Sequence, residues 1–311
     1  ADTVVRVEDT EEEAGAVRIL TDRDAGRNVR ARGEDVRRGE TVLAPGSVLR
    51  PWEIGVLATV GRARVRTHRR PRVAILVNGD ELASLEDFDE VLAGRRIVDS
   101  NSHALAAAVR AAGCEPRLLG IARDDEGSIR ERLSAGLECD AIVTVAGASV
   151  GEHDLVKRAL AGMGFRLDFW RVRMKPGNPF SFGHLDGVPV FGLPGNPVSA
   201  GVTFEVLVHP ALRLMLGRSA VHSPTIGVAT GETLEPLADR VQFLRVRLEK
   251  EARGTFTARR TGPQGSGILS SLARADALLV VPAGDEPIPA GTRLAAIPLP
   301  APDEGQASSG F

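Results

Sequence analysis

Tyrosine is absent from this chain of 311 residues, and cysteine occurs only at Cys114 and Cys139. The first absence excludes tyrosine chemistry at any site. The two cysteines lie among apolar residues and do not have the spacing of metal ligands. One disulfide and two free thiols are both compatible with the sequence, and a reducing cytoplasm is the expected compartment.

Long apolar runs and a strong charge of one sign are also missing. No apolar run approaches the roughly 20 residues that span a bilayer, and the first ten residues lack the basic start and apolar stretch of a signal peptide. Lys and Arg number 39 against 41 Asp and Glu, a formal net charge of -2. We therefore expect a cytoplasmic protein with no membrane and no nucleic-acid partner.

The distribution of β-rich and alternating segments predicts four parts. Residues 1–45 form a β-rich partial domain, residues 46–70 a connector, residues 71–219 an α/β domain, and residues 220–311 a β domain with a disordered tail. In the first two parts we expect strands at 4–7, 16–20 and 41–43 and a short helix at 52–60.

Strand and helix patterns alternate in residues 71–219. Apolar runs at 73–77, 118–121, 141–145 and 188–191 are typical of buried parallel strands. Apolar stripes between and after them predict helices, of which the last runs from Pro197 to about Leu216 with a kink at Pro210. This alternation predicts a doubly wound, mostly parallel sheet. In residues 220–311 we expect short strands at 226–229, 241–248, 255–260, 278–281 and 293–297.

Glycines and carboxylates follow the predicted parallel strands. Ligands of such sheets bind beyond the carboxyl ends of the strands, where glycine-rich turns can cradle phosphate and carboxylates can hold Mg²⁺. The sequence therefore suggests a nucleotide or phosphorylated cofactor together with a divalent metal. The loops concerned are 78–82, 124–125, 146–154 and 192–199.

Each of these signals also has a simpler interpretation. Gly79 and Gly147 fit ordinary turns after a strand, Asp124 fits a helix N-cap, and Asp154 fits a helix dipole partner. Lys175 can belong to a plain turn, although a lone lysine in an arginine-rich chain favours a point-charge role. Arg245 and Arg247 alternate along one predicted strand, so at least one of them should face solvent.

Taken together, the motifs resemble one family. Ser149-Val150-Gly151-Glu152-His153-Asp154, Met174-Lys175-Pro176-Gly177, Phe180-Ser181-Phe182-Gly183 and Gly192-Leu193-Pro194-Gly195-Asn196-Pro197 occur in that order. This combination resembles the molybdopterin molybdenumtransferases, the MoeA and gephyrin E-domain family of molybdenum insertases. Arg30 to Val36, Asp99-Ser100-Asn101 and Pro263-Gln264-Gly265-Ser266 support the resemblance, which covers nearly the whole chain.

The resemblance implies an enzyme that inserts molybdate into adenylylated molybdopterin and releases AMP, working as a cytoplasmic homodimer with Mg²⁺ or another divalent cation. Its implied metal ligands are Glu81, Asp124 and Asp154, and its implied catalytic residues are Asp124, Asp154 and Lys175. Arg30 and Asp35 would reach the site across the dimer. The expected substrate-binding residues are Arg30, Asp35, Gly79, Gly147, Ser149, Gly151, Arg171, Pro194, Gly195, Asn196, Arg245 and Ser266.

The chain departs from the family pattern in several places. The family usually has Ser-Thr before Gly79 and a glycine at position 146, where this chain has Val77-Asn78 and Ala146, and a second lysine where it has Asn178. The family's Met-Asp-Gly-Tyr-Ala and Thr-Gly-Ala segments do not occur, which implies a truncated chain or a divergent relative. These departures leave an alternative function, a catalytically weakened carrier or interaction module that binds molybdopterin. An adenylyltransferase acting on molybdopterin is a third interpretation, which the flanking β segments disfavour.

Overall fold

The structure is a computed structural model that describes residues 1–145, 155–251 and 254–299. It divides into two compact units, Ala1–Val65 and Arg66–Phe311. Each unit is described by itself below.

The N-terminal unit is built around a small hairpin. Strands β1 (Thr10–Glu13) and β2 (Ala16–Ile19) pair antiparallel, with Thr10 opposite Ile19. Ala14 and Gly15, which join them, both have positive φ, 48° and 83°. A two-residue turn of that conformation matches the twist of the two strands. A 3-10 turn (Val7–Asp9) precedes the hairpin, and helix α1 (Pro51–Thr59) follows it.

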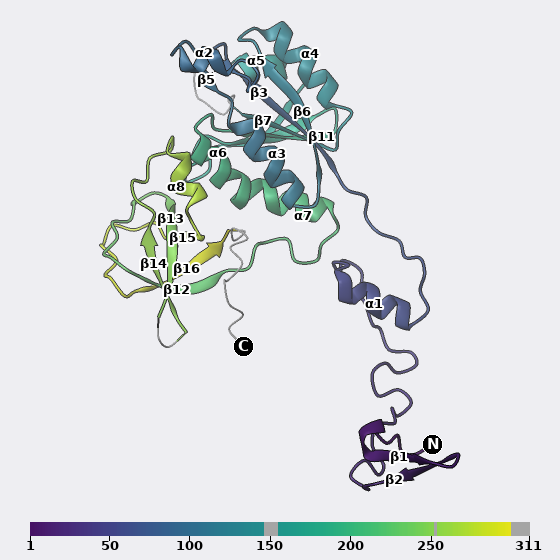
Figure 1. The fold of residues 1–311 in the computed structure, drawn as a ribbon. Helices are drawn as coiled ribbons and strands as arrows, with labels where there is room; N and C mark the ends of the chain where they lie inside the picture. The colour runs from purple at the N-terminus through teal and green to yellow at the C-terminus, as the bar shows by residue number, and fades with distance from the viewer. Residues whose placement is uncertain (146–154, 252–253, 300–311) are drawn as a thin grey trace. The chain divides into compact units, whose positions relative to one another are not determined.

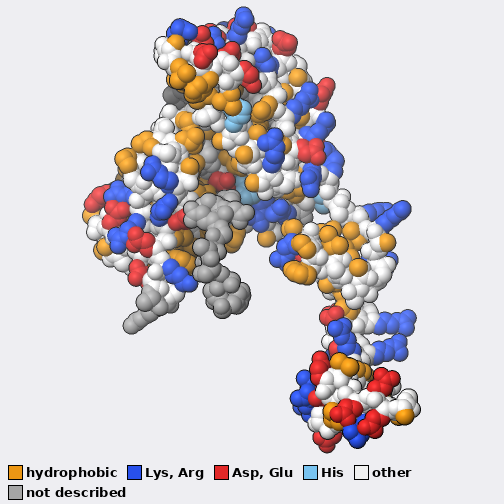
Figure 2. All heavy atoms as spheres, viewed as in Figure 1, with side chains coloured by type: hydrophobic (Ala, Val, Ile, Leu, Met, Phe, Trp, Pro, Cys, Tyr) orange, Lys and Arg blue, Asp and Glu red, His pale blue; other side chains and the backbone are white. Residues whose placement is uncertain are grey.

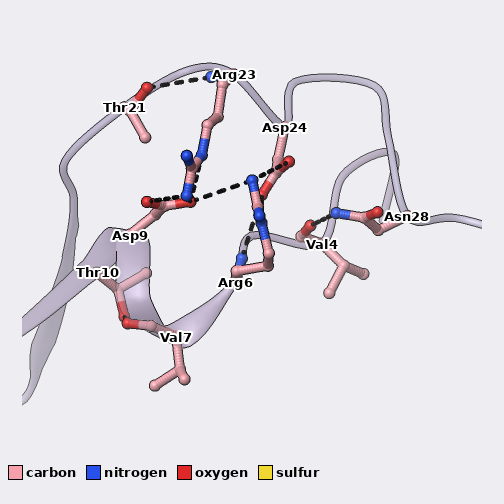
Figure 3. A network of polar contacts seen from close by, with 9 residues as sticks. All are labelled: Val4, Arg6, Val7, Asp9, Thr10, Thr21, Arg23, Asp24 and Asn28. Atoms are coloured by element: carbon pink, nitrogen blue, oxygen red, sulfur yellow. Dashed lines mark hydrogen bonds and ion pairs between the residues drawn. The ribbon is translucent and has the colours of Figure 1, made fainter. Parts of the chain in front are cut away.

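Two aspartates, Asp9 and Asp24, are the only buried residues of the N-terminal unit, at 8% and 5% exposure. Figure 3 shows the arginines that meet them. Arg23 donates to both oxygens of Asp9 at 2.6 Å, and Arg6 Nε donates to Asp24 Oδ2 at 3.1 Å. The hydrogen bond and charge of Arg6 hold the pKa of Asp24 below its usual range. Ion pairs therefore occupy the centre of this unit.

Two of the strands expected in this region were wrong. Residues 4–7 and 41–43 have no sheet partner, and the side chains of Val4 and Val7 are 52% and 77% exposed. Their β-branched residues favour a strand only where a neighbouring strand covers them. The expected helix at 52–60 is confirmed as α1, which begins at Pro51 and buries none of its residues. Figure 2 accordingly shows its hydrophobic side chains on the surface.

The second unit contains a six-stranded sheet in the order β6-β3-β7-β11-β10-β8. The first four strands are parallel, as expected for a mostly parallel sheet: β6 (Glu115–Ala122), β3 (Arg72–Asn78), β7 (Ala141–Val145) and β11 (Val188–Leu193). Strand β10 (Ser181–Leu185) pairs antiparallel with β11, and β8 (Arg166–Trp170) pairs antiparallel with β10. The sequence patterns did not predict these two strands.

Helices cover both faces of this sheet, which confirms the doubly wound architecture (Figure 1). Alternate residues of β3 point to opposite faces: Val73, Ile75 and Val77 enter one apolar cluster, and Ala74 and Leu76 the other. The first cluster packs against α3 (Asn101–Ala111), α6 (Pro197–Thr203) and α7 (His209–Met215). The second packs against α4 (Glu126–Gly136) and α5 (Leu155–Gly162).

The helix predicted from Pro197 onward is interrupted near the expected position. A π-helical turn (Phe204–Val208) separates α6 from α7 directly before His209-Pro210, because proline lacks the amide hydrogen that would continue the regular pattern. By length and composition alone, Pro197–Met215 passes as a membrane-spanning helix, which is weak evidence because 44% of its apolar window is buried in the protein. Val198, Val202 and Leu212 in it are fully buried.

A short excursion lies between β3 and α3. It comprises β4 (Leu82–Ala83), α2 (Phe88–Leu92) and β5 (Ile97–Val98), with β4 and β5 paired in parallel. Leu92 and Ile97 are 74% and 59% exposed, and Figure 2 shows hydrophobic side chains over this region. The sequence patterns did not predict these elements.

The C-terminal strands form a closed barrel. Sheet order is β14-β12-β16-β15-β13-β9, and β13 also pairs with β14. All five predicted strands are present: β12 (Ile226–Thr230), β13 (Val241–Lys250), β14 (Phe256–Arg260), β15 (Ala277–Val281) and β16 (Arg293–Pro298); helix α8 (Leu269–Ala273) was not predicted.

One strand of this second sheet comes from the middle of the chain. The short strand β9 (Met174–Lys175) pairs in parallel with the start of β13, with Lys175 opposite Gln242. Met174 is buried with Val198 and Phe243 in an apolar cluster that joins the two sheets. The predicted lysine motif is thereby attached to the barrel.

Candidate active site

The parallel strands β6, β3, β7 and β11 end at one edge of the central sheet, as the predicted ligand site requires. Asp124 follows β6, and Asn78 to Glu81 follow β3. Residues 194–196 follow β11. The loop after β7 carries the predicted Gly147, Ser149, Gly151 and Asp154, which lie outside the described residues.

The exits of β3 and β6 are joined by hydrogen bonds. Asn78 Nδ2 donates to Asp124 Oδ1 at 3.1 Å, and the amide of Asp80 donates to Asp124 Oδ2 at 3.3 Å. The amide of Asp124 donates in return to Asp80 Oδ1 at 3.2 Å. Gly79 has a φ of 149°, and a Cβ there would lie 2.5 Å from Glu81 Oε2. The positive φ, which residues with a side chain rarely adopt, favours glycine here, whereas the Glu81 carboxylate could move away from a Cβ.

Asp125, rather than Asp124, is the N-cap of α4. Its Oδ1 accepts a hydrogen bond from the amide of Ser128 at 2.7 Å. Asp124 is thus not the helix cap that one interpretation of the sequence allowed, and its carboxylate contacts the loop after β3 instead.

The loop after β11 contacts two other predicted motifs. Asn101 Nδ2 donates to the carbonyl oxygen of Gly195 at 2.8 Å, and the amide of Val198 donates to the carbonyl oxygen of Ser266 at 3.0 Å. Asn196 is the N-cap residue of α6, and Pro197 is its first residue. These two bonds connect Gly195, the start of α6 and the Ser266 loop of the barrel.

A cavity of about 780 Å³ lies where β9 meets the barrel. The predicted Lys175, Arg245 and Ser266 all line it, so the structure brings these three together. Gly177 also lines it; its φ is +102°, and a Cβ there would collide with Thr203 Oγ1, so only glycine fits against α6. The remaining lining residues are Met174, Pro176, Asn178, Pro179, Ser199, Leu237, Asp239, Arg240, Gln242, Phe243, Leu244, Arg260, Gln264 and Gly265.

Arg245 is buried, with 1% of its surface exposed. Its Nε donates to Ser271 Oγ at 3.1 Å and a terminal nitrogen donates to the Gly265 carbonyl at 3.0 Å. Burial lowers the pKa of this guanidinium, and no carboxylate contributes to the shift. Among the described residues, this buried positive charge at the cavity wall is therefore held by neutral oxygens.

The other cations of the cavity are of two kinds. Arg240 donates to the Asp239 carboxylate at 2.8 and 2.6 Å, and Arg260 pairs with Glu232. Lys175 and Arg245 have no carboxylate partner among the described residues. Arg245 is buried, and a buried charge without a counterion is costly, so its guanidinium is suited to bind an anion. Lys175 is exposed and offers a second positive charge in the same cavity.

Arg171 lies at the end of β8, outside that lining. Its guanidinium stacks on the Trp170 ring at 4.1 Å, and its φ is +69°, an uncommon value for a residue with a side chain. Its amide donates to the carbonyl oxygen of Phe180 at 2.8 Å. The role predicted for Arg171 in binding substrate stays a prediction.

Glu81 and Asp124 do not line the cavity around Lys175. Arg30 and Asp35 belong to the N-terminal unit, where both are exposed. The described residues therefore do not place Asp124 in one pocket with Lys175, and the third predicted catalytic residue, Asp154, lies outside the described residues.

The described residues contain no group of three or more His, Cys, Asp and Glu side chains placed to bind one metal ion. They do supply carboxylate oxygens at the β3 and β6 exits, the ligands that Mg²⁺ takes. Beside them Asn78 Oδ1 is buried and has no hydrogen-bond partner among the described residues. The donor chemistry at this edge fits an oxygen-bound cation, to which Glu81 and Asp124 would contribute.

Sequence reasoning did not identify Gln264 as a site residue. Its Oε1 accepts from the amide of Arg245 at 2.9 Å, and its Nε2 donates to the Arg245 carbonyl at 3.2 Å. The side chain thus replaces a strand neighbour and fixes the backbone that carries Arg245. Its place in the Pro263-Gln264-Gly265-Ser266 motif was the signal available.

Arg247, two residues further along β13, is exposed, and its Nε donates only to the carbonyl oxygen of Arg274, at 3.2 Å. The prediction that one of the two alternating arginines faces solvent is confirmed.

Val77 is 1% exposed within an apolar cluster. Its departure from the family's serine therefore removes no group from the cavity.

Comparison with known proteins identifies the parts of the chain. Residues 74–214 match the family described as "Probable molybdopterin binding domain", residues 228–299 the "MoeA C-terminal region (domain IV)", and residues 1–61 the "MoeA N-terminal region (domain I and II)". The divisions predicted at residues 45, 70 and 219 stay predictions.

Relatives with assigned names agree. Molybdopterin molybdenumtransferase 1 of Mycobacterium tuberculosis is 36% identical over 301 residues, which cover 94% of this chain and 69% of that protein. Molybdopterin molybdenumtransferase of Nostoc sp. is 34% identical over 305 residues, which cover 96% and 69%. The crystal structure of a molybdopterin biosynthesis MoeA protein from Pyrococcus horikoshii superposes with a TM-score of 0.75 at 29% identity, covering 96% of this chain and 72% of that one. The chain belongs to the molybdopterin molybdenumtransferase (MoeA) family.

Proposed function

We propose that this protein works in molybdenum cofactor biosynthesis and inserts molybdate into the dithiolene of adenylylated molybdopterin, with release of AMP. The observation that carries the proposal is the buried, uncompensated guanidinium of Arg245, which shares a cavity with Lys175 and Ser266. An oxyanion such as molybdate supplies the missing negative charge.

The cavity residues act on the anionic groups of the substrates. Arg245 is held in place before an anion arrives, so its charge stabilises an oxyanion with little reorganisation. Lys175 adds a mobile point charge for molybdate or the pterin phosphate. Ser266 offers a hydroxyl from the loop that also contacts α6. Arg171, Pro194, Gly195 and Asn196 complete the proposed binding surface.

Carboxylates in the loops that follow β3 and β6 serve cleavage of the phosphoanhydride of the substrate. A divalent cation held by Glu81, Asp124 and Asp154 supplies polarisation of the phosphoanhydride when it is bound. Asp124 keeps its carboxylate oriented through its bonds to Asn78 and Asp80. Action in the cytoplasm as a homodimer, with Arg30 and Asp35 reaching the site from the partner protomer, is also part of the proposal.

The test uses the purified full chain with adenylylated molybdopterin, Mg²⁺ and molybdate, and measures AMP and active cofactor. We expect AMP release that depends on molybdate. Arg245→Met should reduce it by at least about tenfold, since a hydrogen bond to a charged group contributes roughly 1.5–3 kcal/mol. Arg247→Met, on the same strand but exposed, is the matched control and should leave it unchanged. Absence of AMP from the unaltered chain would overturn the enzymatic proposal.

A weakened molybdopterin-binding carrier is the second candidate, and one observation favours it. Asn178, which stands where the family usually has lysine, lines the cavity, so one positive charge is missing beside Lys175. Calorimetric binding of molybdopterin without turnover, together with AMP release restored by Asn178→Lys, would support this alternative. Turnover by the unaltered chain would exclude it.

A further inference from the structure

Asn78 stands at a point where this chain departs from its family, and its side chain contacts a proposed catalytic residue. It is the last residue of β3 and lies opposite Ala122 of β6 in parallel register. Its Nδ2 donates to Asp124 Oδ1 at 3.1 Å, while Asp124 Oδ2 accepts from the amide of Asp80 at 3.3 Å. Both carboxylate oxygens of Asp124 are thereby held by residues of the β3 exit.

Only one orientation of the Asn78 side-chain amide allows its hydrogen bond to Asp124. Asn78 Oδ1 is buried and has no hydrogen-bond partner within residues 1–145, 155–251 and 254–299. If the amide were rotated by half a turn, this acceptor would face the acceptor oxygen of Asp124 and the bond would be lost. Asn78 therefore tolerates an unsatisfied buried oxygen while its nitrogen is directed at Asp124.

The connection between the two loops does not depend on Asn78. The amide of Gly79 donates to the carbonyl oxygen of Ala122 at 3.2 Å, and the amide of Asp124 donates to Asp80 Oδ1 at 3.2 Å. Neither of these bonds involves the Asn78 side chain. Its bond to Asp124 Oδ1 consequently affects the direction of one carboxylate more than the stability of the loops.

We propose that Asn78 is a positioning residue, which fixes the Asp124 carboxylate for cleavage of the adenylylated substrate. The inference rests on the function proposed above, because it gives Asp124 a part in that reaction. Asn78 acts through Asp124 and does not itself meet the reacting atoms. Asn78 stands where the family usually has threonine, whose hydroxyl could donate the same hydrogen bond.

The experiment compares Asn78→Ala and Asn78→Asp with the unaltered chain, with two readouts: AMP release and Mn²⁺ affinity measured by calorimetry. Loss of one hydrogen bond to a charged group should lower kcat by about tenfold or more. KM for adenylylated molybdopterin should change by less than about threefold, since that bond is not made to substrate. Asn78→Asp should lower kcat at least as much as Asn78→Ala does, because two carboxylates would then face each other. Asn78→Thr should recover most of the rate.

Ser84→Ala is the matched control. Ser84 Oγ also donates to an aspartate, Asp87, at 3.0 Å, but it lies in the excursion after β4. The Ser84→Ala substitution should leave kcat and Mn²⁺ affinity unchanged. Thermal unfolding of each variant checks that the fold is kept; should Asn78→Ala fail to fold, Asn78→Asp and Asn78→Thr still decide the question.

A double-mutant comparison separates the two proposals. In an Asp124→Asn background, Asn78→Ala should have no further effect on Mn²⁺ affinity, because its effect passes through Asp124. If Asp124→Asn keeps the full rate of AMP release, the proposed role of Asp124 fails. If Asp124→Asn is inactive and Asn78→Ala matches the unaltered chain, only the positioning role is refuted.

Discussion

The two units of the molecule bury charge in opposite ways. In Ala1–Val65 the only buried residues are Asp9 and Asp24, and each meets an arginine. In the described part of Arg66–Phe311 four apolar clusters form the interior, and the large buried cation there, Arg245, meets only neutral oxygens. A buried charge with an ionic partner is explained by the fold itself, whereas one without such a partner points to a ligand.

The contrast also concerns stability. Apolar burial contributes roughly 25 cal/mol for each Å² removed from water, and the N-terminal unit has almost none of it. Its buried side chains instead take part in ion pairs, whose strength varies with pH and salt. Variants that separate these two modes of stabilisation test the contrast directly.

The largest effect is expected for a truncation in the central sheet. Leu76→Ala removes a side chain that is 0% exposed between β3 and helices α4 and α5. We expect a loss of about 2–5 kcal/mol in the free energy of unfolding, measured in denaturant by circular dichroism. The counterpart Val17→Ala, at a position 64% exposed in β2, should change it by less than about 0.5 kcal/mol. Similar losses in both variants would contradict the contrast.

Next in size is the effect of Arg245→Met. Replacing this buried charge by an apolar side chain of similar length removes its desolvation cost together with its hydrogen bonds to Ser271 and Gly265, so stability should be unchanged or higher. Molybdate affinity, measured by calorimetry, should fall at least about tenfold. Strong destabilisation would mean that Arg245 is primarily a structural residue, as the arginines of the N-terminal unit are.

Acid should loosen the N-terminal unit first. The pKa of Asp24 is lowered in the folded state by its bond to Arg6, so the contribution of this pair is complete well above the ordinary value of 3.8 and is lost as pH falls through the folded pKa. Amide exchange should therefore accelerate in residues 1–65 before it accelerates in β3 and β7. Asp24→Asn should show the loosened state already at pH 7, and an unchanged acid response in that variant would refute the assignment.

The smallest effect concerns thiol reactivity. Cys114 and Cys139 are both free and buried, and burial raises the pKa of Cys114 to about 11. A thiol reagent at pH 8 should modify neither in the native protein and both in denaturant. Because residues 1–65 contain no cysteine, opening of that unit alone should leave the labelling rate unchanged. Rapid labelling of native protein would show that the second unit also opens.

The sequence predicted the regular part of the fold well and its irregular part poorly. The runs at 73–77 and 141–145 are apolar throughout, because both faces of their strands are covered, and such runs are unambiguous. Strand β8 is exposed at four of its five positions, so it carries no comparable signal. The β-branched residues at 4–7 predicted a strand that did not form, because β-propensity is not sufficient to form a strand without a neighbouring strand.

The candidate site, like the fold, could be predicted only in part from the sequence. Alternation along β13 indicated that Arg245 and Arg247 differ in environment, but only packing against Gly265 and Ser271 decides which of them is buried. The convergence of Lys175 and Ser266 depends on the pairing of β9 with β13. A two-residue strand is too short to have a periodicity of its own, so this contact could be expected from the family resemblance and not from the pattern.

That short strand limits how the molecule can be recombined. An exchange of residues 220–299 with those of a relative would supply a new barrel but leave Met174 and Lys175 behind, facing an edge to which they were not matched. A working chimera therefore needs a second crossover, so that the loop from β8 to β10 is transplanted along with the barrel.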